Sequence, residues 1–216
     1  MTISATSLLL VCLTLASGLM TIRAQFRDLR GQVYLFKPLT TILVLLIAIL
    51  PDAVPDPRYR QLIVLGLVFS LAGDVFLMLP SDRFAAGLTS FLIAHLAYIA
   101  AFLPGAAGGP SAWVAAPFLV GGAILYRVLW EHLGALRLPI VGYMLAIAGM
   151  AWLAVERWLT LADTAALLAL IGALLFVISD AALALDRFRK GFDSAPAVIL
   201  GTYFAAQCLI ALSVGG

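Results

Sequence analysis

Apolar residues fill most of the chain in long runs, separated by short clusters of charged residues, proline and glycine. An α-helix of about 20 residues crosses the hydrocarbon core of a bilayer, and eight runs in the 216 residues approach that length. The pattern therefore predicts an all-α membrane bundle of eight transmembrane helices. The predicted spans are 3–22, 36–51, 60–79, 84–103, 112–130, 138–155, 163–185 and 195–214.

Two of these spans need a separate argument. The second begins at Lys37 and Pro38, where proline suits a first helical turn, and it stops before the proline-rich segment 51–57. The first has neither a basic region before it nor a small-residue cleavage site after it. We therefore expect it to be a retained helix rather than a signal peptide.

Composition supports a multi-pass membrane protein. Hydrophobic residues make up 64% of the chain and charged residues 11%, with a mean hydropathy of +1.12. These values are far from those of soluble domains. The net charge of +2, without a basic cluster interleaved with aromatic residues, excludes a nucleic-acid-binding protein. Cys12 and Cys208 lack metal or redox spacing and are interpreted as small buried hydrophobic residues.

Lysine and arginine are concentrated in the odd-numbered connections and the helix ends beside them. Short cytoplasmic loops carry the positive excess in membrane proteins. We therefore predict that the odd connections are cytoplasmic and that both termini lie outside, in the inner membrane if the cell is bacterial. The ten odd-side residues are Arg23, Arg27, Arg30, Lys37, Arg83, Arg127, Arg137, Arg187, Arg189 and Lys190, and the three even-side residues are Arg58, Arg60 and Arg157.

Two predicted spans each contain one aspartate in an otherwise apolar run. Asp74 lies in the segment 69–79 and Asp180 in the segment 172–185, and the tripeptide Asp-Arg-Phe follows both, at 82–84 and 186–188. An ionisable side chain within a membrane segment costs roughly 2.5–3.5 kcal/mol on insertion scales, so it usually faces the bundle interior and marks a site. Both aspartates are therefore candidate catalytic residues.

The layout predicts one domain, residues 1–216, built from two similar halves of about 1–104 and 105–216. Spans three and seven run in the same direction, so the repeat would be parallel, about an axis normal to the membrane. Both acids would lie about 9 Å inside the cytoplasmic boundary. They either share one cleft or each pair separately with a neighbouring hydroxyl group or helix terminus.

Further polar residues lie on the spans that follow the two aspartates. His95 and Tyr98 are three residues apart, and Tyr203 and Gln207 are four apart, so each pair shares a helical face. They are candidate supporting residues, although a lone histidine in an apolar helix often has only a structural role. Tyr143 on the sixth span looks like an ordinary core residue.

Lys37 has two interpretations: its long side chain either extends to the membrane interface or presents a cation to a lipid phosphate. Neither a metal nor another cofactor is expected. Two aspartates and a histidine are possible ligands, but the chain has no HxxxH motif and no Cys/His set.

Five motifs in order resemble the YhhN family of integral membrane proteins, which includes the lysoplasmalogenases. The resemblance covers nearly the whole chain. It implies hydrolysis of the vinyl-ether bond of a lysophospholipid, lysoplasmalogen, to a fatty aldehyde and a glycerophospho-ethanolamine or -choline. The motifs are the segments 37–41 and 73–79, the segment 91–98 with His95 and Tyr98, the segment 175–180, and Tyr203 with Gln207.

Two carboxyl groups suit the chemistry of vinyl-ether hydrolysis. Protonation of the β-carbon gives an oxocarbenium ion that water captures, so one carboxyl group would donate the proton and an ionised one would steady the cation and activate water. His95 or Tyr203 would shuttle a proton to the collapsing hemiacetal. Which aspartate takes which role stays open at this point.

Two other classes compete with an enzyme. Paired intramembrane acids in a parallel repeat also suit a proton-coupled transporter or another lipid-handling membrane protein, although the spans lack paired Gly/Pro interruptions. A non-catalytic scaffold leaves both acids unexplained. The sequence does not predict the oligomeric state.

The charge asymmetry makes a prediction about topology. A reporter that is active only in the cytoplasm, fused after Gly216, should stay silent, whereas the same reporter in the 79–83 connection should be active. A strong cytoplasmic signal at Gly216 would reverse the orientation and place both acids near the opposite face.

Overall fold

A computed structural model describes residues 4–51, 54–106 and 111–215, and it contains eight helices long and apolar enough to cross a membrane. The predicted all-α membrane bundle is therefore confirmed. The helices are α1 (Ala5–Phe26), α2 (Arg30–Ile49), α3 (Pro57–Met78), α4 (Phe84–Phe102), α5 (Ala112–Leu129), α6 (Arg137–Leu161), α7 (Thr164–Phe188) and α8 (Ala195–Leu212). Short 3-10 turns are η1 (Leu103–Gly105), η2 (Trp130–His132), η3 (Gly134–Leu136) and η4 (Ser213–Gly215).

The start of α2 corrects the sequence prediction. The helix begins at Arg30, not at residue 36, so Lys37 and Pro38 lie inside it and not in its first turn. Proline is tolerated within membrane helices because neighbouring groups satisfy the freed backbone carbonyl. The lysine charge is tolerated because it is paired within the bundle, as described below.

Several helices also extend beyond their predicted apolar runs. Helix α1 continues to Phe26 rather than 22, α6 to Leu161 rather than 155, and α7 to Phe188 rather than 185. Their last turns carry polar or charged residues, which end an apolar run in the sequence but do not end a helix at the membrane interface. Several of the basic residues assigned to connections therefore lie on helix ends.

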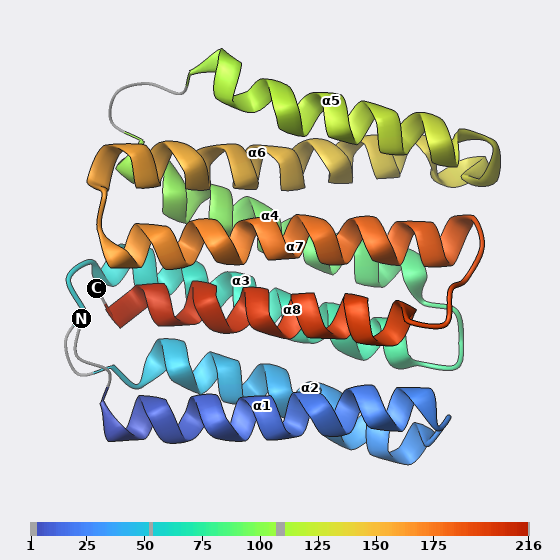
Figure 1. Ribbon diagram of the computed structural model, residues 1–216, viewed down its shortest axis with the longest axis horizontal. Coiled ribbons are helices and arrows are strands. Elements are labelled where there is room, and N and C mark those ends of the chain that lie inside the picture. Colours follow the sequence, from blue (N-terminus) through green and yellow to red (C-terminus); the bar gives the residue numbers. More distant parts are fainter. Residues whose placement is uncertain (1–3, 52–53, 107–110, 216) are drawn as a thin grey trace.

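The two helices that carry the intramembrane aspartates begin in the same way. Asp56 caps α3 by accepting from the backbone N–H groups of Arg58 and Tyr59 at 2.9 and 3.1 Å, and Asp163 caps α7 by accepting from that of Ala166 at 2.7 Å. Such caps satisfy backbone donors that the first turn leaves unpaired. Both helices run in the same direction (Figure 1).

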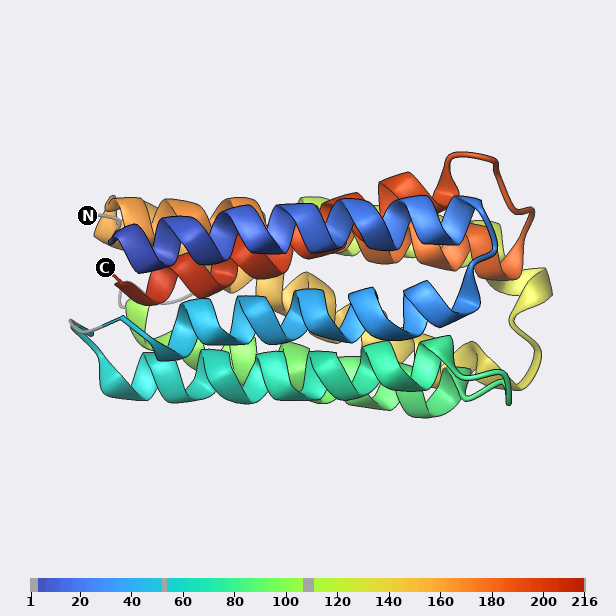
Figure 2. The same ribbon diagram turned by 90° about the horizontal axis from the view of Figure 1, so that it is seen from below.

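Six helices form a ring in the order α2, α3, α4, α6, α7, α8, in which each contacts the next and α8 contacts α2. Helix α1 packs outside this ring on α2 and α8, and α5 packs mainly on α6 at the edge of the bundle (Figure 1). Both described ends of the chain lie at the same end of the bundle (Figure 2). The α1–α2, α3–α4 and α7–α8 connections lie at the opposite end.

Glycine residues let neighbouring helices pack closely at two similar places. Gly66 on α3 packs against the ring of Tyr98. On α7, a Cβ added at Gly172 would lie 2.8 Å from the backbone oxygen of Ala206. Small residues at such crossings are typical of membrane helix packing. Each glycine lies two turns before its aspartate, and the predicted relation between the halves 1–104 and 105–216 stays a prediction.

The ring interior near the chain termini is filled by large buried side chains. Five large side chains from four helices of the ring are fully buried: those of Ile63, Leu67, Phe102, Met150 and Ile210. Close packing of this kind leaves few voids larger than a water molecule. Space for a ligand is therefore found at the other end of the ring.

Candidate active site

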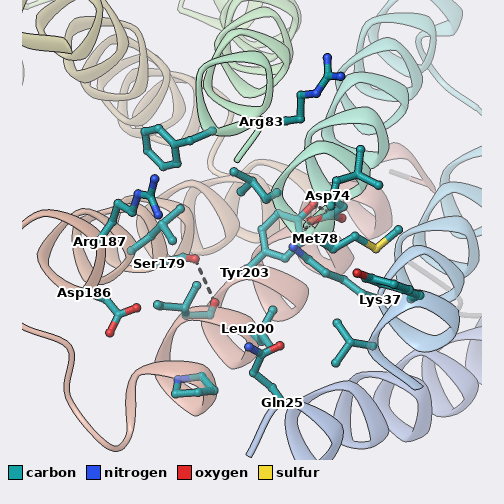
Figure 3. A pocket seen from close by; sticks show the side chains of 18 of the residues that line it. Gln25, Lys37, Asp74, Met78, Arg83, Ser179, Asp186, Arg187, Leu200 and Tyr203 are labelled. Atoms are coloured by element: carbon teal, nitrogen blue, oxygen red, sulfur yellow. Dashed lines mark hydrogen bonds and ion pairs between the residues drawn. The ribbon is translucent and has the colours of Figure 1, made fainter. Parts of the chain in front are cut away.

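A cavity of about 690 Å³ lies at the end of the bundle that carries the α1–α2, α3–α4 and α7–α8 connections. Its volume is within the range of sites for small ligands, roughly 300–1,000 Å³. Charged residues line the mouth, and Asp74 and Asp180 both line the interior. Figure 3 shows Lys37 and Tyr203 pointing toward Asp74.

Asp74 is enclosed by donors from two neighbouring helices. The Nζ atom of Lys37 lies 3.3 Å from its Oδ1 atom, and the hydroxyl groups of Thr41 and Tyr203 donate to Oδ2 at 2.6 and 2.7 Å. The side chain is only 2% exposed. A buried carboxylate with a cation and two hydroxyl donors has the compensation that its ionised form needs.

Asp180 has a different environment. The Tyr143 hydroxyl group donates to its Oδ2 atom, and Nε2 of His95 lies 3.9 Å from the same oxygen. The side chain is 14% exposed, more than that of Asp74. In the described parts of the chain, no lysine or arginine nitrogen lies within 4.0 Å of this carboxyl group. Asp180 therefore lacks the cation that Asp74 has.

Aromatic rings pack between the two acids. Phe91, Phe176 and Tyr203 contact one another edge to face, with ring centroids 5.6 to 6.2 Å apart. His95 packs on Phe176 at 4.7 Å and on Tyr143 at 5.1 Å. One packed wall therefore connects the partners of Asp74 with those of Asp180.

The sequence left two arrangements open for the aspartates, a shared cleft or separate partners, and the structure has features of both. The two carboxyl groups line one cavity, and each also has its own hydroxyl partner on another helix. Asp74 lies one turn before Met78, the end of α3, whereas Asp180 lies two turns before Phe188, the end of α7. Helix α7 therefore extends about one turn further beyond its acid.

The supporting residues named from the sequence separate into two groups. His95 faces Asp180 and Tyr203 binds Asp74. The Tyr98 hydroxyl group instead donates to Oε1 of Gln207 at 2.7 Å, deeper in the ring, and neither of these two residues lines the cavity. The structure thus brings His95 and Tyr203 to the acids and places Tyr98 and Gln207 in a separate buried pair.

Two partners of the acids were not identified from the sequence. Tyr143 was interpreted as an ordinary core residue but donates to Asp180, and Thr41 donates to Asp74. The position of Thr41, one turn after Lys37, gave a signal because such residues share a helical face. The α6 pattern gave no comparable signal for Tyr143.

The two copies of Asp-Arg-Phe meet at the mouth of the cavity. An Nη2 atom of Arg187 lies 2.6 Å from Oδ2 of Asp82, and the Phe84 and Phe188 rings pack edge to face at 5.4 Å. The Nε atom of Arg83 donates to Oγ of Ser81 at 3.3 Å, and among the residues described Arg83 makes no ion pair. Its guanidinium group is therefore available at the mouth.

Metal ligands are not gathered in the described residues: no three histidine, cysteine, aspartate or glutamate side chains lie close enough together to hold an ion. Asp180 and His95 approach each other, but Asp74 has its own partners on α2 and α8.

A model of the YhhN family matches residues 32–214. The chain belongs to the YhhN family. It is 32% identical over 208 residues to the membrane protein YhhN of Escherichia coli, covering 96% of this chain and 98% of that one. A Mycobacterium bovis protein named lysoplasmalogenase is 32% identical over 193 residues, 85% of this chain and 71% of its own.

A human member, named lysoplasmalogenase TMEM86B, is 36% identical over 159 residues, covering 74% of this chain and 66% of its own. No solved structure matches the chain. The family resemblance suggested by the sequence motifs is confirmed, and the chain is a multi-pass membrane protein.

The ion pair at Asp74 makes a prediction about stability. Lys37→Met should lower the free energy of unfolding by about 3 kcal/mol, because it leaves a buried carboxylate without its cation. The double variant Lys37→Met/Asp74→Asn should regain most of that loss. Unfolding in mild detergent would measure both. A Lys37→Met protein as stable as the wild type would show that the pair does not stabilise the bundle.

Proposed function

We propose that the chain is a membrane hydrolase that cleaves the vinyl-ether bond of lysoplasmalogens. The observation that carries the proposal is one cavity lined by two carboxyl groups in different environments, one paired with a lysine and the other without a cation. Relatives from Mycobacterium bovis and human are named lysoplasmalogenases, which supports the same activity.

The two environments suggest a role for each acid. Burying a charge without a partner of opposite sign is costly, and Asp180 has no neighbouring cation among the described residues. Asp180 is therefore assigned the protonated, neutral form, which donates its proton to the β-carbon of the vinyl ether. Asp74, held ionised by Lys37, faces the oxocarbenium ion and accepts a proton from the attacking water. The logic is that of paired carboxyl groups on either side of an oxocarbenium-like transition state.

The reaction balances with water as its only co-reactant. The C=C bond accepts the proton of Asp180, and the oxygen of water bonds to the carbon next to the ether oxygen while its proton passes to Asp74. The resulting hemiacetal breaks its bond to the glycerol oxygen. Its hydroxyl proton passes to Asp180, and the proton on Asp74 goes to the departing oxygen, which gives aldehyde and alcohol.

Neighbouring residues position these groups. The Tyr143 hydroxyl group holds Oδ2 of Asp180, which leaves Oδ1 to carry the transferable proton. Tyr203 binds Asp74 and contributes its ring to the aromatic wall, where ring faces favour a nearby cation. His95 lies 3.9 Å from Asp180 and lines neither cavity, so it is assigned to position Asp180 and not to carry a proton to or from the hemiacetal.

The mouth of the cavity suits a phosphate-bearing head group. Arg83 lines the mouth without an acidic partner among the described residues, and an arginine binds phosphate oxygens through two parallel donors. Lys37 is already paired with Asp74. We therefore place the phosphate at Arg83, and Lys37 acts on the acid rather than on the head group.

A transporter is the competing function, but the cavity gives it little support. The lining residues come from the end of the bundle with the odd-numbered connections, while the other end of the ring interior is filled by buried apolar side chains. Alternating access would require these packed helices to separate.

The decisive prediction concerns the products. Purified protein in detergent should release free aldehyde from lysoplasmalogen without added metal or nucleotide, and chelation should leave the rate unchanged. The ester analogue should remain intact because the chain has no GxSxG nucleophile motif. The Asp180→Asn protein, prepared in the same way, controls for contaminating activity. Release of fatty acid from the ester and no aldehyde from the vinyl ether would contradict the proposal.

A second prediction concerns the two acids as a unit. Asp74→Asn and Asp180→Asn should each lower kcat by about a hundredfold or more, and the double variant should lose little further activity, as for groups that act together. Asp56→Asn is a matched control, because the amide oxygen of asparagine can replace the carboxylate that caps the far end of α3. Rates should be compared at equal amounts of folded protein. Full activity in either single variant would remove that residue from the mechanism.

A further inference from the structure

A second cavity, of about 330 Å³, lies between α4, α5, α6 and α7. Side chains such as Phe118, Leu125, Met144 and Val177 make its lining almost entirely apolar. Asp180 is the one charged residue among the described residues that line it, and Tyr143 contributes the other polar group. The cavity is therefore suited to hydrocarbon except at the place where it reaches Asp180.

The second cavity adjoins the first. Leu77, Phe84, Phe91, Asp180 and Leu183 line both of them. The polar cavity lies on one side of Asp180 and the apolar cavity on the other. A molecule that occupies both must have a polar end and an apolar end, with the junction between them next to the carboxyl group of Asp180.

The apolar cavity also reaches the surface that faces lipid. Pro117 and Gly121 on α5 line the cavity and are exposed. Helix α5 packs mainly on α6 and contributes many of the exposed large hydrophobic residues of the bundle, including Leu119, Val120 and Ile124. A hydrocarbon chain can therefore continue from the cavity into the bilayer beside α5.

We propose that the apolar cavity binds the proximal part of the hydrocarbon chain of the single-chain lipid, so that the bond between chain and glycerol lies beside Asp180. This inference rests on the proposed function and assigns a binding site and chain specificity to it. The volume limits the bound length. A methylene group fills about as much space as a water molecule, roughly 30 Å³, so the cavity holds on the order of ten methylene groups.

The cavity acts by shape rather than by attraction. Lipid tails are as apolar as leucine side chains, so moving a chain from the bilayer into the cavity gains little free energy. Its effect is to fix the chain, and with it the position of the reacting double bond. Holding a reacting group in place is a large source of rate enhancement.

The glycine pair on α5 provides a clean test. A Cβ added at Gly121 or Gly122 would meet nothing within 4 Å, and both residues line the cavity, so a leucine side chain at either position should occupy part of the cavity. With an 18-carbon alkenyl chain, Gly122→Leu should lower kcat/KM by about tenfold or more. With a chain short enough to leave the filled region empty, the rate should stay within about twofold of the wild type.

Gly142→Leu is the matched control. Gly142 is exposed on α6, has no neighbour within 4 Å of an added Cβ, and does not line either cavity. This variant should keep the wild-type dependence on chain length. Gly121→Leu is the second test variant, and it should shift the dependence in the same direction as Gly122→Leu. Wild-type profiles in both cavity variants would overturn the inference.

Photolabelling supplies a readout that needs no turnover. A 1-acyl lysophospholipid with a diazirine in the first half of its chain should label Phe118 or Val177 in the wild type, and the label should fall at least tenfold in Gly122→Leu. Labelling spread over the lipid-facing side of α1 would show that the cavity does not hold the chain. If wild-type protein releases no aldehyde at any chain length, the proposed function fails, whereas labelling at the cavity would still establish the chain site.

Discussion

The whole arrangement depends on compensating two carboxyl groups inside a bundle that is surrounded by lipid. Each acid takes its partners from other helices of the ring. Asp74 on α3 binds Lys37 on α2 and Tyr203 on α8, whereas Asp180 on α7 is held by Tyr143 on α6 and faces His95 on α4. Every helix of the ring therefore contributes to one acid or the other. Loss of a partner should disturb helix packing as well as chemistry, because a buried polar group without its partner is costly.

The division of the ring into two sets of three helices also explains how two similar aspartates come to have different surroundings. Both acids lie in an apolar helix two turns after a glycine at a close helix crossing. What differs is the lysine on α2, which has no counterpart beside Asp180 within the described chain. One positive charge thus makes the pair unequal, and inequality between two acids is the condition that acid/base catalysis requires.

Much of the fold could be predicted from the sequence because its signals are local. Long apolar runs predict eight spans, and a charge within such a run identifies Asp74 and Asp180. Contacts between distant segments were not predictable in the same way. A tyrosine on an apolar helix has the same local pattern whether it only packs in the core or, like Tyr143, donates to a carboxylate on another helix. The start of α2 was misplaced for the same reason, because only the ion pair with Asp74 shows why Lys37 can lie inside a membrane helix.

The packed apolar half of the ring has a consequence for the energetics of the membrane. Buried acids that exchanged protons with both sides of the bilayer would let protons leak across it and would dissipate an electrochemical gradient. Here the cavity and its acids lie toward one end, and at the other end side chains such as Phe102, Met150 and Ile210 fill the interior. Hydrocarbon packing of this kind is a barrier to ions because a charge moved into it loses its hydration. In the proposed reaction, Asp74 and Asp180 would therefore exchange protons with one side of the membrane only.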